Sequence, residues 1–155
     1  MTIEDIEIAV AKHWNIRVFV IVPNASWGAG VHECDLLILS SSGYLTEIEI
    51  KTTKADLVKD LKKEHQHRSD KIKHLYYALP DRVLNANETK ELIPARAGIL
   101  RIWKSEYGDY NCDMEREATI NKIAEPLSEV ERFQIARLGA MRVWDLKERI
   151  QKVRE

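Results

Sequence analysis

Acidic residues stand inside two predicted strands in the stretch Val31-His-Glu-Cys-Asp-Leu-Leu-Ile-Leu-Ser-Ser-Ser-Gly-Tyr-Leu-Thr-Glu-Ile-Glu-Ile-Lys51. Residues 36–39 form a continuous apolar run, as expected of a strand that is buried on both faces, and residues 44–51 alternate with a period of two. The alternation directs Glu49 and Lys51 to the same face of the second strand. The stretch therefore predicts a β-hairpin that carries a polar site on one face.

A turn that contains glycine sets the register of this hairpin. We expect a loop of residues 41–43, with its glycine in the left-handed conformation that closes such turns. Ser40 then lies opposite Tyr44, and counting back along the two strands places Asp35 opposite Glu49. A loop of two or four residues would turn Asp35 to the other face, so the predicted site depends on this register.

The predicted register brings two carboxylates together. Directly opposed residues share a face, with Cβ atoms roughly 4.5–5.5 Å apart. At that separation Asp35 and Glu49 can hold one divalent cation through oxygens at about 2.1 Å. Lys51 lies two residues along the same strand, within reach of whatever binds the cation. Glu33, which faces Lys51 in this register, either orients that lysine or is a surface acid at the start of a strand.

These residues resemble a known nuclease motif. Asp35, followed after the hairpin by Glu49-Ile-Lys51, is similar to the D…ExK core of the PD-(D/E)XK nuclease superfamily, with Cys34 in place of the proline of that motif. The segments 47–57 and 75–80 resemble, more narrowly, the MmcB-like group of this superfamily and related phage-borne proteins. The resemblance rests on the strand placement, the following helix and the later Tyr-Tyr strand together.

The resemblance covers roughly residues 3–103 and implies a restriction-endonuclease-like α/β fold, in which helices flank a mixed central sheet. It also implies a metal-dependent deoxyribonuclease that acts in DNA repair, recombination or phage DNA processing. In such a site Asp35, Glu49 and the backbone carbonyl of Ile50 would hold Mg²⁺ or Mn²⁺. Two nearby carboxylates should raise the pKa of Lys51, so we expect it to orient water and stabilise phosphate charge rather than act as a base.

The first predicted helix supplies a further candidate for the metal site. Thr2 and Asp5 form a capping box, and a helix is expected to run from there to about His13. Superfamily members often aim a glutamate from this helix at the metal. Glu7 lies at the edge of the apolar stripe and Glu4 lies farther round, so Glu7 is the better candidate, with a solvated helix acid as the alternative. The stripe consists of Ile3, Ile6, Val10 and Trp14.

A basic segment follows the hairpin and is the predicted contact surface for nucleic acid. Between residues 59 and 73 there are six lysines and arginines against three acids, on and after a helix opened by the capping residue Thr53. We expect phosphate contacts there, although an ordinary charged helix face is the alternative. A zinc site is not predicted, because His65 and His67 would diverge on a helix and no cysteine has ligand spacing. The predicted contacts are Lys62, Lys63, His67 and Arg68, with Trp27 from a preceding loop stacking on a base unless it folds onto the core.

The remaining segments predict the rest of the sheet and a helical end. Strands are expected at 16–22, 75–80 and 98–103, with a parallel crossover between the hairpin and the second of these. A helical segment is expected at about 127–154, with Gly139 bending or dividing it. Its apolar residues favour a core position over an interface, although Trp144 leaves a homodimer open. These apolar residues are Val130, Phe133, Leu138, Met141 and Trp144, with Ile150 near the chain end.

Composition sets the outer bounds. The chain has 155 residues, 45% of them hydrophobic, which predicts a single domain over 1–155. Its net charge of −1 means that nucleic acid must be held by a local patch and transiently. Two cysteines without paired spacing fit a reducing cytoplasm, and no apolar run has the length of a membrane span.

Two other functions stay open. One is a Holliday-junction resolvase, in which two sites on a symmetric dimer cut paired strands of DNA. The other is a DNA-binding or assembly subunit that does not cut. The complete set of Asp35, Glu49 and Lys51 argues against the second, because a lapsed site has no physical reason to keep acids side by side on strands.

Overall fold

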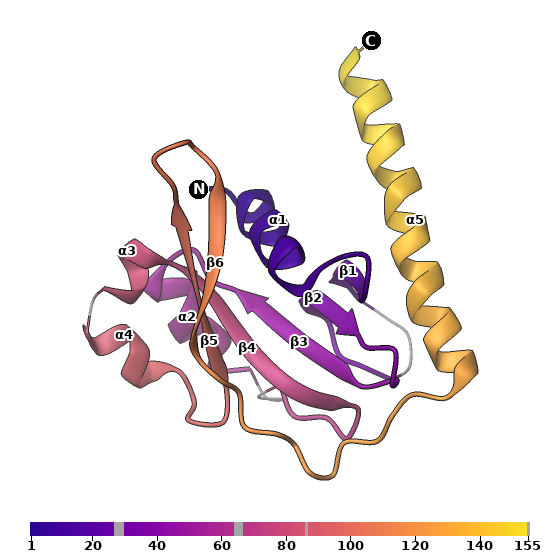
Figure 1. Cartoon of the computed structure of the whole chain (residues 1–155), viewed down its shortest axis with the longest axis horizontal. Coiled ribbons are helices and arrows are strands. Elements are labelled where there is room, and N and C mark those ends of the chain that lie inside the picture. The colour runs from indigo at the N-terminus through magenta and orange to yellow at the C-terminus, as the bar shows by residue number, and fades with distance from the viewer. Residues whose placement is uncertain (27–29, 64–66, 86, 155) are drawn as a thin grey trace.

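A computed structural model of the chain describes residues 1–26, 30–63, 67–85 and 87–154 (Figure 1). Helices lie against both faces of a central sheet, and the last helix projects beyond the rest of the molecule. Among the described residues no helix combines the length and the apolar character needed to cross a membrane. The elements in chain order are α1 (Ile3–Trp14), β1 (Val20–Ala25), β2 (Cys34–Leu39), β3 (Leu45–Ile50), α2 (Lys54–Asp60), β4 (Ile72–Pro80), α3 (Asp81–Leu84), α4 (Asn87–Leu92), β5 (Gly98–Lys104), β6 (Tyr110–Arg116) and α5 (Glu129–Arg154).

The described strands form one mixed sheet of six strands in the order β1-β2-β3-β4-β5-β6. The pairs β1/β2, β2/β3 and β5/β6 are antiparallel, whereas β3, β4 and β5 run parallel to one another. The predicted α/β class, with a mixed sheet flanked by helices, is confirmed. The predicted parallel crossover is confirmed as well, because β3 and β4 pair in parallel and α2 lies between them in the chain.

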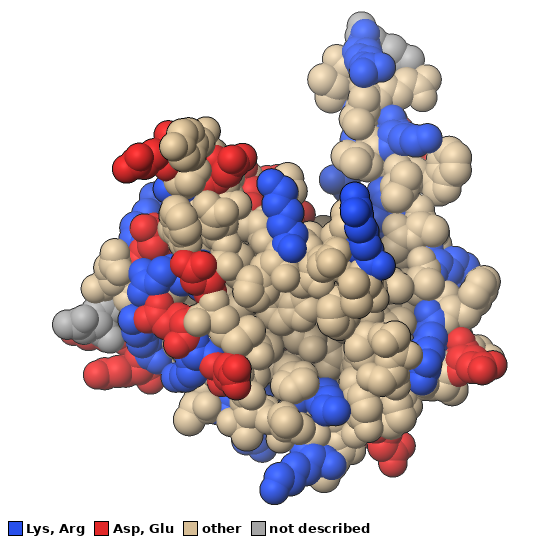
Figure 2. Space-filling model, viewed as in Figure 1, with Lys and Arg blue, Asp and Glu red and all other residues tan. Residues whose placement is uncertain are grey.

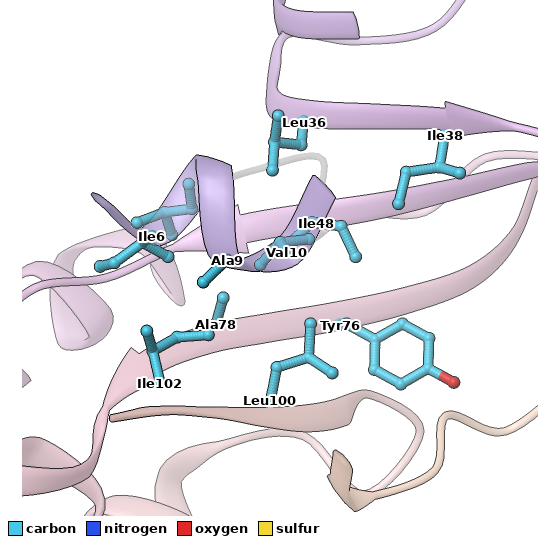
Figure 3. Close-up of a cluster of buried hydrophobic side chains, with 11 residues drawn as sticks. Ile6, Ala9, Val10, Leu36, Ile38, Ile48, Tyr76, Ala78, Leu100 and Ile102 are labelled. Atoms are coloured by element: carbon cyan, nitrogen blue, oxygen red, sulfur yellow. The ribbon is translucent and has the colours of Figure 1, made fainter. Parts of the chain in front are cut away.

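The two faces of the sheet carry separate cores, because successive residues of a strand point to opposite sides. Figure 3 shows Ile6, Ala9 and Val10 of α1 facing the strands on one side. Leu57 of α2 and Ile135 of α5 are buried in two clusters on the other side. The strand residues beneath α1 are Leu36, Ile38, Ile48, Ile50, Tyr76, Ala78, Leu100 and Ile102. Those on the opposite side include Leu37, Leu39, Leu45, Leu75, Tyr77, Leu79 and Ile99.

The predicted register of the β2/β3 hairpin is confirmed. Leu36 pairs with Ile48, and the ladder continues in step to the turn, where the Ser40 backbone N–H donates to the Tyr44 carbonyl at 3.0 Å. Gly43 closes the turn with φ +89°, the left-handed conformation that glycine adopts at no steric cost. The same register, continued one pair beyond Leu36 and Ile48, sets the Asp35 and Glu49 positions opposite each other.

The first strand differs from its prediction. It was expected at residues 16–22 and ends instead at Ala25, beginning at Val20. Pro23 lies within the strand, paired with Leu36. A proline lacks the N–H that a ladder needs, and it is tolerated here because β1 is at the edge of the sheet. The apolar residues before Val20 do not form a buried strand, since Ile16 lies on the surface and is 69% exposed.

The predicted division of the last helix at Gly139 is wrong. Residues 129–154 form one continuous helix, opened by a capping box of Ser128 and Glu131. A Cβ atom at Gly139 would lie 3.2 Å from Cγ2 of Val22, so this glycine allows the helix to approach β1 closely. Of the five residues predicted to form its core stripe only Leu138 is buried. These apolar residues of α5 are exposed instead: Val130, Phe133, Met141, Val143, Trp144, Leu146, Ile150 and Val153.

Candidate functional site

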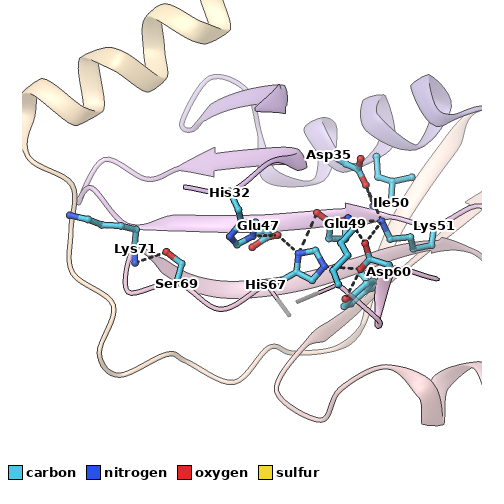
Figure 4. Close-up of polar contacts among 12 residues, drawn as sticks. His32, Asp35, Glu47, Glu49, Ile50, Lys51, Asp60, His67, Ser69 and Lys71 are labelled. Carbon is cyan, nitrogen blue, oxygen red and sulfur yellow. Dashed lines mark hydrogen bonds and ion pairs between the residues drawn. The ribbon is translucent and has the colours of Figure 1, made fainter. Parts of the chain in front are cut away.

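A cluster of buried charged side chains lies on the face of β3 opposite α1 (Figure 4). Its members come from β3 and the residue after it, from the end of α2 and from the turn before β4. Buried charges are costly unless they are paired and hydrogen-bonded, so such a cluster calls for an explanation. The buried members and their exposed fractions are Glu47 at 0%, Glu49 at 1%, Lys51 at 8%, Asp60 at 3% and His67 at 2%.

Asp35, Glu49 and Lys51 meet as the hairpin register predicts. The Nζ atom of Lys51 lies 2.6 Å from Oε2 of Glu49 and 3.4 Å from Oδ2 of Asp35. Asp35 Oδ2 also accepts the backbone N–H of Ile50 at 2.7 Å. The Asp35 side chain is 37% exposed, whereas that of Glu49 is 2% exposed. The Lys51 ammonium group therefore lies between a buried carboxylate and a partly exposed one. This is the position expected for a cation that the two carboxylates share.

Burial and charge shift the pKa values of this group. Burial raises the pKa of Glu49 to about 7, and the nearby charge of Asp35 adds to that rise while Lys51 opposes it. Burial alone would lower the pKa of Lys51, but the negative charges of Glu49, Asp35 and Asp60 outweigh it and raise that pKa above its ordinary value. The predicted direction for Lys51 is confirmed. In this arrangement the Lys51 ammonium is a charged hydrogen-bond donor to Glu49 and Asp35.

Asp60 joins this group, which sequence reasoning did not predict. Its Oδ1 atom lies 3.2 Å from Nζ of Lys51 and 2.6 Å from Nζ of Lys63. Burial would raise the pKa of Asp60, yet hydrogen bonds from His67 and Lys63 hold it well below its usual range. Asp60 is one of the three acids counted between residues 59 and 73, and it is buried. A signal was present, because Asp60 lies one helical turn after the buried Leu57.

Glu47 binds two histidines through one oxygen. Its Oε1 atom lies 2.8 Å from Nε2 of His32 and 2.6 Å from Nδ1 of His67. Burial would raise the pKa of Glu47, but the hydrogen bonds from both imidazoles lower it. Among the described residues none donates a hydrogen bond to Oε2 of Glu47 or to Oε1 of Glu49. Neither His32 nor this role of Glu47 was predicted, because nothing in the spacing of the two residues links them.

His67 was predicted to contact nucleic acid, and its position corrects that prediction. The ring is buried, with Nε2 2.7 Å from Oδ2 of Asp60 and Nδ1 on Glu47. Burial would lower the pKa of His67, but hydrogen bonds to Asp60 and Glu47 raise it to about 9. The residue lies in a turn with φ +53°, a left-handed conformation that aims the side chain inward. His65, the other histidine of the rejected zinc site, lies outside the described residues.

Glu7 is placed more favourably than Glu4. It is half-buried on α1, and burial raises its pKa, with further contributions from the charges of Glu4 and Asp35. Asp35 is thus close enough to act on Glu7 electrostatically. Glu4 is exposed, and a hydrogen bond at the helix N-terminus lowers its pKa. The preference for Glu7 as the helix acid of the site agrees with this geometry.

The predicted nucleic-acid contacts are divided between the surface and the cluster. Lys62 and Arg68 are exposed. Lys63 is 44% exposed, but its ammonium pairs with Asp60, so it belongs partly to the cluster. Trp27 lies outside the described residues. A shallow groove on α2 is lined by Lys54, Ala55, Val58, Lys59 and Lys62.

Glu33 is exposed, whereas Lys51 is buried and pairs with the acids Asp35, Glu49 and Asp60. Of the two interpretations of Glu33, the surface acid agrees with this position. The residue lies just before β2 begins at Cys34. A backbone position outside the ladder is not held opposite its partner strand, so the predicted pairing of Glu33 with Lys51 is not favoured.

Comparisons with known proteins bear on the fold alone. No family model matches the chain, and no curated protein matches it. A solved structure described as the SPO1766 protein of unknown function from Silicibacter pomeroyi is similar, with a TM-score of 0.62 and 23% sequence identity. The similarity covers 97% of this chain and 89% of that one. Another solved structure therefore shares this α/β architecture over nearly the whole length of the chain.

Proposed function

We propose that this protein is a cytoplasmic, metal-dependent nuclease that hydrolyses phosphodiester bonds in DNA during repair, recombination or phage DNA processing. The observation that carries the proposal is the meeting of Asp35, Glu49 and Lys51 at the adjoining ends of β2 and β3. Both cysteines are free thiols, which suits a reducing compartment. The order of these three residues along the chain is also that of the nuclease motif they resemble.

The donor set fits a divalent cation. Asp35 and Glu49 already surround a positive charge, the Lys51 ammonium, and Oε1 of Glu49 is a buried oxygen without a hydrogen-bond donor among the described residues. Asp35, Glu49 and the carbonyl of Ile50 would hold Mg²⁺ or Mn²⁺, which prefer oxygen ligands. When bound, such an ion activates water as a nucleophile and offsets the charge that develops on the phosphate.

The protein's own groups have separate roles in this proposal. Lys51, kept protonated by its carboxylate neighbours, donates hydrogen bonds to the scissile phosphate and orients the attacking water. Glu7, with its raised pKa, is the nearby acid that can exchange a proton with solvent. Lys62 and Arg68 contact phosphates away from the scissile bond, which positions the strand without reading its sequence.

The test is a panel of labelled substrates incubated with Mg²⁺, with Mn²⁺ and with EDTA. The panel contains single-stranded, double-stranded and four-way-junction DNA and matching RNA. We expect cleavage of DNA only with a metal present, and its loss in Asp35→Ala. Glu33→Gln is the matched control, because it removes the charge of an exposed acid two residues from Asp35. Absence of cleavage on every substrate would favour a DNA-binding subunit that does not cut.

A second candidate is a resolvase-like homodimer, favoured by the exposed apolar residues of α5. Trp144 is 63% exposed and Leu146 57% exposed, both in the part of α5 that follows Gly139. Figure 2 shows lysine and arginine side chains along the same projecting helix, where a second strand of DNA could be held. Preference for four-way junctions together with a dimer in sedimentation would select this candidate over a monomeric nuclease.

A further inference from the structure

Three segments far apart in the sequence converge beside the proposed nuclease site. His32 precedes β2, Glu47 lies in β3 and His67 lies in the turn before β4. Each offers one metal-ligating atom, and these atoms all lie within 4.8 Å of one another. Glu47 is the common centre, with the two imidazole nitrogens 2.8 and 2.6 Å from its Oε1 atom. Figure 4 shows both rings directed at the Glu47 carboxylate.

The chemistry of this set differs from that of the nuclease site. Two imidazoles and one carboxylate form a ligand set that binds Zn²⁺, with a fourth position left for water. Imidazole also suits other first-row transition ions, whereas Mg²⁺ prefers oxygen ligands alone. Asp35 takes no part in the set. The cluster would therefore select a softer ion than the one proposed for Asp35 and Glu49.

The surroundings of His67 are those of a metal ligand. A ligating histidine usually donates its other ring N–H to a carboxylate, which fixes the tautomer and the orientation of the ring. Nε2 of His67 lies 2.7 Å from Oδ2 of Asp60, and the Tyr77 hydroxyl donates to the same oxygen at 3.0 Å. With Nε2 committed to Asp60, the lone pair of Nδ1 can be directed at an ion beside Glu47.

Two further observations point to a ligand between these residues. Glu47 is 0% exposed, yet no described residue donates to its Oε2 atom. A protonated His67 would pair with Oε1 and still leave Oε2 without a partner, at the cost of an unsatisfied buried acceptor. His67 also adopts φ +53°, a conformation uncommon for residues other than glycine, and such strain tends to persist where it positions a functional side chain.

We propose that His32, Glu47 and His67 form a second metal site, selective for Zn²⁺ or a similar transition ion and separate from the Asp35 and Glu49 pair. An ion in this position ties the segment before β2 to β3 and to the turn before β4, next to the Lys51 cluster. Glu47 and Glu49 point to the same face of β3, so the two sites are neighbours on one strand.

The experiment uses Zn²⁺ and Co²⁺ alone as probes and the Asp35→Asn chain, from which the proposed nuclease site has been removed. We expect this chain to retain one Zn²⁺ after dialysis and to give a visible Co²⁺ absorption band. His32→Gln, whose amide can still donate to Glu47, should abolish that binding in the same background. Asp60→Asn should weaken it about 10–100-fold, as is usual for the partner of a ligating histidine. Glu33→Gln is the control that should change nothing.

A second measurement needs no substitution. Stoichiometric Zn²⁺ should shift the ring NMR resonances of His32 and His67 in the unmodified protein and leave those of His13 and His74 unchanged. The proposal is overturned if Asp35→Asn binds no Zn²⁺, if His32→Gln binds it as tightly as its parent, or if all four rings respond alike. Its failure is distinct from failure of the proposed function, because an unmodified protein that binds Zn²⁺ and cuts no DNA refutes only the nuclease, whereas one that cuts DNA with Mg²⁺ and binds no Zn²⁺ refutes only this site.

Discussion

The Nζ atom of Lys51 lies 3.2 Å from Oδ1 of Asp60, a carboxylate that comes from the end of α2 and not from the hairpin. Lys51 is thus held by three acids from three elements, with Glu49 on its own strand segment and Asp35 on the neighbouring strand. A lysine fixed on several sides loses little further freedom when it binds a phosphate. Asp60 is therefore a positioning residue for the proposed reaction.

Asp60→Asn tests this role. The variant removes a counterion from two lysines while keeping the shape of the side chain. Breaking a buried ion pair typically costs about 3–5 kcal/mol, so we expect a clearly lower melting temperature together with reduced cleavage at saturating substrate. Asp70→Asn, which changes an exposed acid of the same basic segment, is the control for both readouts. Wild-type stability in Asp60→Asn would show that the buried charges do not depend on this carboxylate.

Asp35→Ala should abolish cleavage with little effect on the stability of the fold. Asp35 is partly exposed, so its removal leaves little buried charge unpaired, and the fold should persist while metal-dependent cleavage is abolished. Lys51→Ala should also abolish cleavage, but Lys51 is buried between carboxylates and its loss will lower stability as well. Circular dichroism separates the two effects. Cleavage that survives in folded Asp35→Ala protein would contradict the proposed site.

Thermal melts of Asp35→Asn in EDTA and in excess Mg²⁺ separate a metal ligand from a structural acid. In EDTA the variant should be more stable than the wild type, by roughly 1 kcal/mol at most, because relief of the repulsion between Asp35 and Glu49 outweighs the loss of the 3.4 Å contact between Asp35 and Lys51. The asparagine oxygen can still accept the Ile50 N–H. Mg²⁺ should stabilise the wild type by mass action, about 2.7 kcal/mol at 100 times its Kd, and leave the variant unchanged. Equal shifts in both proteins would identify Asp35 as structural.

The stability of the metal-free protein should fall as the pH rises above neutrality. The pKa of His67 is raised from 6.5 to about 9 in the folded state, so its stabilising contribution is fully present below pH 6.5 and is lost as the pH rises through 9. Denaturant unfolding in EDTA across this range measures the effect. His67→Gln should be less stable at pH 6.5 and show a flatter dependence. A variant that keeps the wild-type slope would assign the titration to another group.

Salt dependence tests the nucleic-acid surface. Lys63 pairs with Asp60, so the exposed Lys62 and Arg68 are the better pair to change. Their double substitution with glutamine should weaken DNA binding on all sequences alike, and the slope of log K against log salt should fall by about 0.9 for each phosphate of duplex DNA that is no longer neutralised. Lys12→Gln, on the helix that packs against the other face of the sheet, is the control. An unchanged slope would show that DNA is bound by a different surface of the protein.

Local sequence determined the hairpin and the three site residues that it carries, Asp35, Glu49 and Lys51. A glycine at position 43 allows the left-handed turn, and the turn sets which residues of the two strands are opposed. Because side chains alternate along a strand, the register alone places Asp35, Glu49 and Lys51 on one face. The pKa direction of Lys51 followed from the same placement. Helix starts at Thr2 and Ser128 were also readable, since a capping box involves residues only three apart.

Tertiary structure decided which other side chains complete the site. Asp60 and His67 reach Lys51 and Glu47 only because the crossover from β3 to β4 folds α2 and the following turn back over β3. A histidine in a turn has no periodicity to show where it points, so its burial could not be predicted from spacing. The close approach of α5 to β1 at Gly139 likewise involves Val22, more than a hundred residues away in the sequence. Contacts of this kind arise from packing between elements, which the local alternation of polar and apolar residues does not encode.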